Sequence, residues 1–196
     1  MWVIKLGGGL AQDPILDEWL AQLTTLGGGR AVVVPGRGCS AGFVRELQLQ
    51  WQFDDLVAHN MLVLARAQYG LLMGGLAPAL EPAVAAADIR GILQRGGVAL
   101  WMPLSLMREQ ADEMAVPDMT SDCIAAWLAA HLNAERLILV KSRPIAAQAS
   151  IAQHIRDGVL DQRFARYARI AACPVDVLHK SEPQRLQSLL LNGAAI

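Results

Sequence analysis

Three consecutive glycines follow a short apolar run near the start of the chain. The run Trp2–Leu6 contains one charged residue, Lys5, and is followed by Gly7, Gly8 and Gly9. A buried strand that ends in a glycine turn can bring backbone N–H groups and a cation to a phosphate group. A first strand followed by a flexible turn would have the same pattern. The stretch is therefore a candidate phosphate site.

A second glycine turn has the same setting. The β-branched run Ala31–Val34 is followed by Pro35 and then by Gly36, Arg37 and Gly38. Ligands of open α/β sheets bind at the carboxyl ends of the strands, where both turns are expected. Two such turns could hold a substrate phosphate from both sides, although ordinary strand–helix turns would look alike.

Lysines are rare in this chain, and two of them stand at the ends of expected strands. There are fourteen arginines but three lysines, and Lys5 and Lys141 stand at the ends of expected strands. An ammonium group there suits the charge that develops on a transferring phosphoryl group, whereas the alternative is a snorkelling lysine. Asp122 falls in the first turn of an expected helix, where it either stabilises the helix dipole or positions a catalytic lysine. Lys5, Asp122 and Lys141 are the catalytic candidates.

Several familiar chemistries are excluded by the motifs. No Gly-x-x-x-x-Gly-Lys-Ser/Thr stretch occurs, and Leu10–Gln12 interrupt the glycine spacing that a dinucleotide-binding turn needs. The four histidines have no ligand spacing and no cysteine beside them, so no metal site is predicted. No Ser–His or Cys–His arrangement can be argued from the linear order.

Composition limits the class of protein and its partners. The chain has 196 residues, of which 54% are hydrophobic and 18% charged, as expected of a single globular domain. A net charge of -1 predicts neither a nucleic-acid partner nor an anionic membrane surface. Three scattered cysteines and no signal-peptide pattern predict a cytoplasmic protein. The apolar stretch Tyr69–Leu80 is too short and too broken by glycine and proline to span a bilayer.

Alternating strand and helix patterns predict a three-layer α/β/α sandwich with a mainly parallel sheet. Residues 74–88 give no clear pattern, and Leu104–Asp118 is expected to be a loop that could cover a site. Strands are expected at Trp2–Leu6, Ala31–Val34, Val98–Met102, Leu137–Val140 and Val175–Leu178. Helices are expected after Asp13-Pro14 to Leu26, at Ala41–Trp51, Asp54–Leu72 and Ile89–Gln94, from Thr120 to Leu132, and at Ala147–Arg156, Gln162–Ala172 and Pro183–Leu191.

Three motifs in order resemble the amino acid kinase family, which includes the aspartate, acetylglutamate and uridylate kinases. They are Val3–Gly8, Val34–Gly38 and Thr120–Asp122, and the resemblance extends over most of the chain. The family implies an amino acid kinase-like fold and ATP with Mg²⁺ as the phosphoryl donor. It also implies a small phosphate or carboxylate acceptor.

Within that family the chain is similar to the small kinases of methanofuran synthesis in methanogens and methylotrophic bacteria. The matching residues are Phe43–Arg45, Ala58–Met61 and Asp118–Leu128. Those kinases phosphorylate an aminomethyl-furan-methyl phosphate to the diphosphate. The resemblance therefore implies a role in one-carbon cofactor biosynthesis.

The resemblance also implies residue roles. Lys5 would stabilise the transferring phosphoryl group, with Asp122 orienting it and a second cation such as Lys141. The glycines of the first turn, Gly7 to Gly9, would donate N–H groups to phosphate oxygens. The second turn, Gly36, Arg37 and Gly38, would face the acceptor. Arg45 and His59 are candidates for binding an anionic acceptor, although a structural role for His59 is at least as strong an alternative.

The carboxyl-terminal half departs from the family pattern. Lys141-Ser142-Arg143-Pro144 replaces a common Asp-Gly pair, and no glycine-rich turn with a lysine occurs between Ile145 and Pro174. Arg37 also replaces a glycine that is common in the second turn. We therefore expect an acceptor-binding half at about 1–103 and a shortened nucleotide half at about 104–196.

Two classes of function follow from this sequence. One is an ATP-dependent kinase, and the other is a non-catalytic relative that binds a phosphorylated metabolite or acts as a partner subunit. The apolar helix expected at Asp54–Leu72 would suit a homodimer interface, but a core helix has the same pattern.

Overall fold

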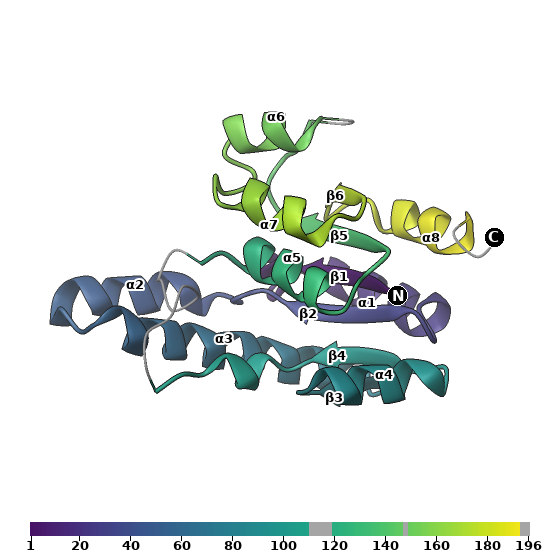
Figure 1. Ribbon diagram of the computed structural model, residues 1–196, viewed down its shortest axis with the longest axis horizontal. Coiled ribbons are helices and arrows are strands. Elements are labelled where there is room, and N and C mark those ends of the chain that lie inside the picture. The colour runs from purple at the N-terminus through teal and green to yellow at the C-terminus, as the bar shows by residue number, and fades with distance from the viewer. Residues whose placement is uncertain (110–118, 147–148, 193–196) are drawn as a thin grey trace.

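The computed structural model describes residues 1–109, 119–146 and 149–192. In these residues one sheet of six parallel strands lies between two layers of helices (Figure 1). This arrangement confirms the predicted three-layer α/β/α class. The strands are β1 Trp2–Leu6, β2 Ala31–Pro35, β3 Leu80–Ala83, β4 Val98–Trp101, β5 Arg136–Lys141 and β6 Val175–His179, in the sheet order β3-β4-β2-β1-β5-β6.

The helices connect these strands in chain order. The α-helices are α1 Ile15–Leu26, α2 Ser40–Trp51, α3 Asp55–Leu76, α4 Ala86–Gln94, α5 Ser121–His131, α6 Ile151–Arg156, α7 Phe164–Ala171 and α8 Pro183–Asn192. Two short 3-10 helices are η1 Gly8–Leu10 and η2 Pro103–Leu106. Within the described ranges, no helix is long and apolar enough to cross a membrane.

Burial on both faces explains why these strands form a parallel sheet. All five residues of β1 and all five of β2 are buried, and a parallel sheet needs helices on each face. Helices α4, α5 and α7 pack on the face that carries Val3, Val32 and Leu139. Helices α1, α3 and α8 pack on the face that carries Ile4 and Val33. Side chains therefore alternate between two cores along each strand.

The sequence missed one strand, and its expected helix starts differ most from the structure at α4, which begins at Ala86 rather than Ile89, and at α6. Strand β3 falls in the stretch 74–88, where its four residues include Pro82, a residue tolerated at a sheet edge. Helix α6 begins at Ile151, because the Ser150 side chain accepts a hydrogen bond from the N–H of Gln153 and caps it. Residues 147–148 of the helix expected there lie outside the described residues. Residues 110–118 of the expected loop lie outside the described residues, and 103–106 form η2.

The topology creates a crevice at the carboxyl ends of β1 and β5. These strands are neighbours, yet the chain leaves β1 toward α1 on one face and β5 toward α7 on the other. Ligands of open α/β sheets bind at such a switch point. The α2–α3 pair projects beyond this edge of the sheet (Figure 1) and packs through Val44, Ala58 and Leu62.

Candidate active site

Lys5, Asp122 and Lys141 form one buried ionic cluster at the crevice. Lys5 Nζ lies 2.8 Å from Asp122 Oδ1, and Lys141 Nζ lies 2.5 Å from Asp122 Oδ2. The side chains of Lys5, Asp122 and Lys141 are 6%, 6% and 13% exposed. The structure therefore brings together three residues that are far apart in the sequence.

Three neighbouring elements position the cluster. Lys5 pairs with Leu139 in the sheet, so Lys141 lies two residues further along on the same face. Helix α5 packs on that face, and the Thr120 side chain caps it by accepting from the N–H of Cys123 at 3.3 Å. The cap starts the helix so that Asp122, in its first turn, meets both lysines.

The charges of this cluster do not cancel. Burial alone would raise the pKa of Asp122, but the two ammonium groups outweigh it and hold the pKa at about 2. Burial lowers the pKa of Lys5 despite the attraction of Asp122, and the positive charges of Lys141 and Arg37 lower it further. One carboxylate faces two lysines, so the cluster favours a bound anion.

The two glycine turns are in direct backbone contact beside the cluster. A Cβ on Gly8 would lie 2.7 Å from the N and O atoms of Gly38, and one on Gly36 would lie 2.5 Å from the N atom of Gly8. Gly38 has a φ of +58°, which also favours glycine. Only glycines allow this contact, so the turns form a single rim.

The structure corrects one detail of the predicted phosphate donors. The N–H of Gly7 donates to the carbonyl of Val140 at 3.1 Å and so extends the sheet. Gly7 therefore contributes close packing rather than a free donor. Gly8 and Gly9 begin η1, and the first N–H groups of a helix have no acceptor within it. These two amides are the available donors of the turn.

Replacing Gly8 by alanine is expected to separate the turns, because the new Cβ meets backbone atoms that cannot rotate away. We expect inorganic pyrophosphate to bind about tenfold more weakly and the free energy of unfolding to fall by about 1–3 kcal/mol. Titration calorimetry and urea denaturation measure these two effects. In the control, Gly75→Ala, the new Cβ has nothing within 4 Å and should not alter binding. If Gly8→Ala binds pyrophosphate as tightly as the unaltered protein, the two glycine turns do not form one phosphate-binding rim.

Two connected cavities open at this rim. The first, which we call the rim cavity, has a volume of about 580 Å³ and is lined by Lys5, Gly8, Gly38, Asp122 and Lys141 among others. The second, the outer cavity, measures about 980 Å³ and extends between α2 and α3. Both include Arg37, Thr120 and Asp161 in their walls, so a ligand could occupy them together.

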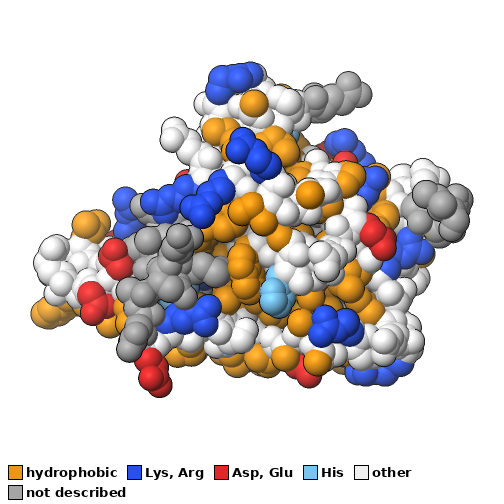
Figure 2. Space-filling model, viewed as in Figure 1, with side chains coloured by type: hydrophobic (Ala, Val, Ile, Leu, Met, Phe, Trp, Pro, Cys, Tyr) orange, Lys and Arg blue, Asp and Glu red, His pale blue; other side chains and the backbone are white. Residues whose placement is uncertain are grey.

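Of the residues predicted to bind the acceptor, some line the cavities and one is buried in the interior. Arg37 lines both cavities and Arg45 lines the outer one, together with Arg163. Figure 2 shows Lys and Arg side chains gathered between the positions of α2 and α7. His59 instead is 3% exposed, its Nε2 lies 2.9 Å from the carbonyl of Leu106, and it lines neither cavity. The structure does not bring His59 to the rim.

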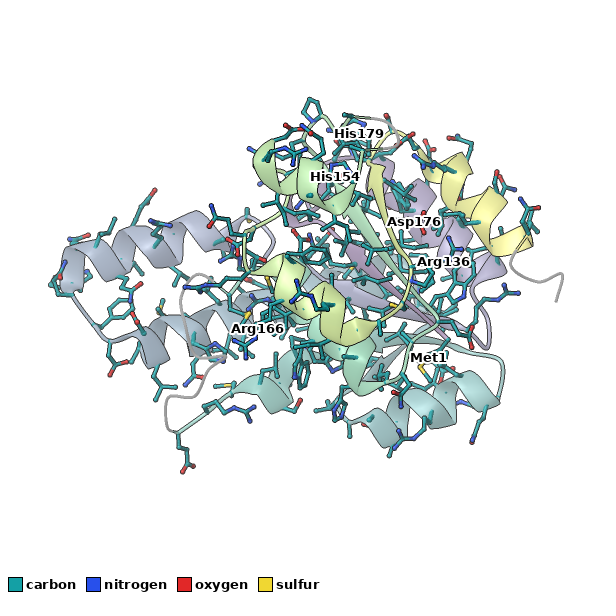
Figure 3. All side chains as sticks on the ribbon, turned by 45° about the horizontal axis from the view of Figure 1, so that its top comes forward. Met1, Arg136, His154, Arg166, Asp176 and His179 are labelled. Atoms are coloured by element: carbon teal, nitrogen blue, oxygen red, sulfur yellow. The ribbon has the colours of Figure 1, made fainter. Side chains whose placement is uncertain are left out.

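The sequence did not single out the opposite wall of the rim cavity. Residues 158–162, between α6 and α7, line it together with Ile155. His154 supports this wall, because its backbone carbonyl accepts from the N–H groups of Val159 and Leu160. Figure 3 shows His154 on α6. It also labels Arg136 and Asp176, whose ion pair joins the first residue of β5 to β6 at 2.7 Å. No phosphate-binding motif marks this wall.

The arrangement fits phosphate groups better than a protein-bound metal. Two ammonium groups and the amides of the first turn suit phosphate oxygens. Within residues 1–109, 119–146 and 149–192, no group of three His, Cys, Asp or Glu residues could hold a metal ion. Asp122 is already paired with both lysines. A Mg²⁺ ion held mainly by the phosphates of a nucleotide is compatible with this site.

No protein-family model matches the sequence, and no curated protein matches it. Solved structures match over nearly the whole chain. Uridylate kinase from Archaeoglobus fulgidus is 14% identical with a TM-score of 0.73, covering 97% of this chain and 95% of that chain. UMP kinase from Bacillus anthracis is 17% identical with a TM-score of 0.72, covering 97% and 91%. Isopentenyl phosphate kinase of T. acidophilum is 11% identical with a TM-score of 0.64, covering 96% and 95%.

These neighbours have the amino acid kinase fold, and so does this chain. The resemblance inferred from the three sequence motifs is therefore confirmed for the fold. At these identities the similarity carries no substrate from one protein to another. The likeness to the kinases of methanofuran synthesis stays a prediction.

Proposed function

We propose that this protein is an ATP-dependent kinase that transfers a phosphoryl group to a small phosphate or carboxylate acceptor. The observation that carries the proposal is the buried Lys5–Asp122–Lys141 cluster, which lies in the wall of the rim cavity beside two glycine turns. Phosphoryl transfer depends mostly on positioning and on neutralising charge, and it needs no protein nucleophile.

Each residue of the rim then has a role. Lys5 neutralises charge on the transferring group, Lys141 adds a second cation, and Asp122 holds the two ammonium groups at one edge. The amides of Gly8 and Gly9 donate to phosphate oxygens, and the second turn faces the acceptor. ATP would bring Mg²⁺ with its phosphates.

For the acceptor we propose a phosphate monoester bound in the outer cavity. Arg37, Arg45 and Arg163 supply positive charge there, and Val44, Phe53 and Leu62 supply apolar surface. A ring that carries a phosphate satisfies both requirements. The sequence resemblance favours the furan phosphate of methanofuran-type cofactor synthesis, and the acceptor-binding half would be residues 1–103.

A non-catalytic protein that binds a phosphorylated metabolite, or that serves as a partner subunit, is the second candidate. The sequence after β5 favours it, because Lys141–Pro144 replaces the Asp-Gly pair of the family and residues 104–196 would form a shortened nucleotide half. This candidate predicts binding of a phosphate ester without ATP turnover.

Calorimetry with ATP and Mg²⁺, followed by transfer assays with furan, nucleotide and amino-acid acceptors, separates the two candidates. The kinase proposal predicts nucleotide binding at or below the millimolar range and transfer to at least one acceptor. Absence of nucleotide binding at millimolar concentration, with a phosphate ester still bound, would favour the non-catalytic protein.

We also propose that the chain forms a homodimer through α3. Val57, Leu64 and Leu71 are exposed and recur every seven residues, which places them along one side of the helix. Light scattering should give a mass close to twice 21.1 kDa. Leu64→Asp should lower that mass to the monomer value, because it places a charge in the apolar contact.

A further inference from the structure

Arg66 is a buried arginine with little to pair with. It lies in the middle of α3 and is 1% exposed. Its Nη2 donates to the carbonyl of Met119 at 3.1 Å, while Nε and Nη1 have no hydrogen-bond partner among the described residues. In the described part of the chain, no carboxylate forms an ion pair with it. A guanidinium group with five N–H donors is thus mostly unsatisfied.

Without a bound ligand, such a side chain is expected to lower the stability of the folded protein. Burying a charge without a counter-charge or a full set of hydrogen bonds is unfavourable, and an apolar residue of similar volume would often be more stable. Burial lowers the pKa of Arg66 to about 9, and the positive charge of Arg37 contributes to the lowering. The ligand-free protein therefore gains little from this arginine.

Arg66 lies behind residues that form the wall of the outer cavity. Ala58 and Leu62, on the preceding turns of the same side of α3, line that cavity. Tyr69, on the following turn, would contact a Cβ on Gly38 at 3.6 Å. Met119, which accepts from Arg66, directly precedes Thr120 in the wall of both cavities. Arg66 therefore lies next to residues that adjoin the acceptor side of the rim.

We propose that Arg66 is a positioning residue whose unpaired buried charge is balanced by the anionic group of the acceptor bound in the outer cavity. The inference rests on the proposed function in so far as it assumes that an anionic ligand enters there. Arg66 acts from behind the wall, through its charge and through the Met119 carbonyl that it holds. Its charge is poorly screened because water does not reach it.

Arg66→Met tests the proposal in the ligand-free protein and in binding. Methionine removes the charge and the unsatisfied donors, so the melting temperature should be unchanged or higher. Phenyl phosphate, an anionic monoester with an apolar ring, should bind on the order of tenfold more weakly, as measured by calorimetry without nucleotide. Phenol, the neutral analogue, should bind equally to both proteins.

Two further variants serve as controls. Arg66→Lys keeps the charge and should retain most of the affinity for phenyl phosphate. Arg90→Met removes the same charge from an exposed position on α4, which contributes to neither cavity, and should change neither quantity. Neither binding nor melting requires ATP turnover, so the inference survives if no kinase activity is found.

Three results would overturn the proposal. One is a lower melting temperature for Arg66→Met that Arg66→Lys restores, with unchanged binding of phenyl phosphate, because that pattern describes a structural residue. The second is equal weakening in Arg90→Met, which would indicate a long-range effect of net charge. The third is no binding of phenyl phosphate to the unaltered protein at millimolar concentration.

Discussion

Lys5→Met should lower kcat/KM for phosphoryl transfer about 10³-fold, equivalent to about 4 kcal/mol of transition-state stabilisation. The Lys5 ammonium group lies in the wall of the rim cavity with Gly8 and Gly38. Charge neutralisation at that place is the main contribution that a protein makes to this reaction. Methionine has similar length and no charge, so it removes that contribution selectively.

The fold should tolerate this substitution. Asp122 keeps Lys141 at 2.5 Å, so the carboxylate is not left as a lone buried charge. We expect the free energy of unfolding, from urea denaturation, to change by less than about 2 kcal/mol. Lys180→Met is the matched control, since Lys180 pairs with Asp13 outside both cavities. Activity of Lys5→Met within about tenfold of the unaltered protein would disprove the role of Lys5.

Asp122→Asn should have the largest effect on stability, a loss of about 3–5 kcal/mol at pH 7. The substitution leaves two buried ammonium groups, Lys5 and Lys141, without the carboxylate that lies between them. Urea denaturation at pH 7 measures the loss. Asp88→Asn is the control, because Asp88 is exposed and, within the described residues, its carboxylate accepts only from the backbone N–H groups of Val84 and Ala85.

The pH dependence of stability provides an independent measure of the same carboxylate. The pKa of Asp122 is about 2 in the folded protein against an ordinary value of 3.8, so protons bind more readily to the unfolded chain. The lowered pKa of Asp122 thus adds about 2 kcal/mol to the free energy of unfolding above pH 4, and this contribution is lost as the pH falls toward 2. In the Asp122→Asn variant, the free energy of unfolding should therefore fall about 2 kcal/mol less between pH 4 and pH 2. Parallel stability profiles for the two proteins would contradict the buried pairing.

The sequence predicted the layers of the fold because its apolar runs are long and its glycines are well placed. Five strands were expected from β-branched runs, whereas β3 is four residues long at the edge of the sheet and contains Pro82. Such a strand has no periodicity that separates it from a loop. The fold class needed only the alternation of strands and helices.

The candidate site could be predicted only where a residue type was unusual for its position. Lys5 and Lys141 were noticeable because lysines are rare in this chain and both stand at strand ends. The engagement of the Gly7 N–H with Val140 depends on strand register, which local sequence does not specify. His59 and Arg66 lie on the same helix, and only the packing reveals that both are buried. The catalytic roles themselves stay proposals.

A crystal structure with Mg²⁺ and a non-hydrolysable ATP analogue tests the central claim most directly. We predict that the terminal phosphate lies in the rim cavity, within hydrogen-bond distance of Lys5 Nζ and of the N–H of Gly8. A nucleotide bound elsewhere, or a rim cavity that stays empty at millimolar analogue, would contradict the assignment of this rim as a phosphoryl-transfer site.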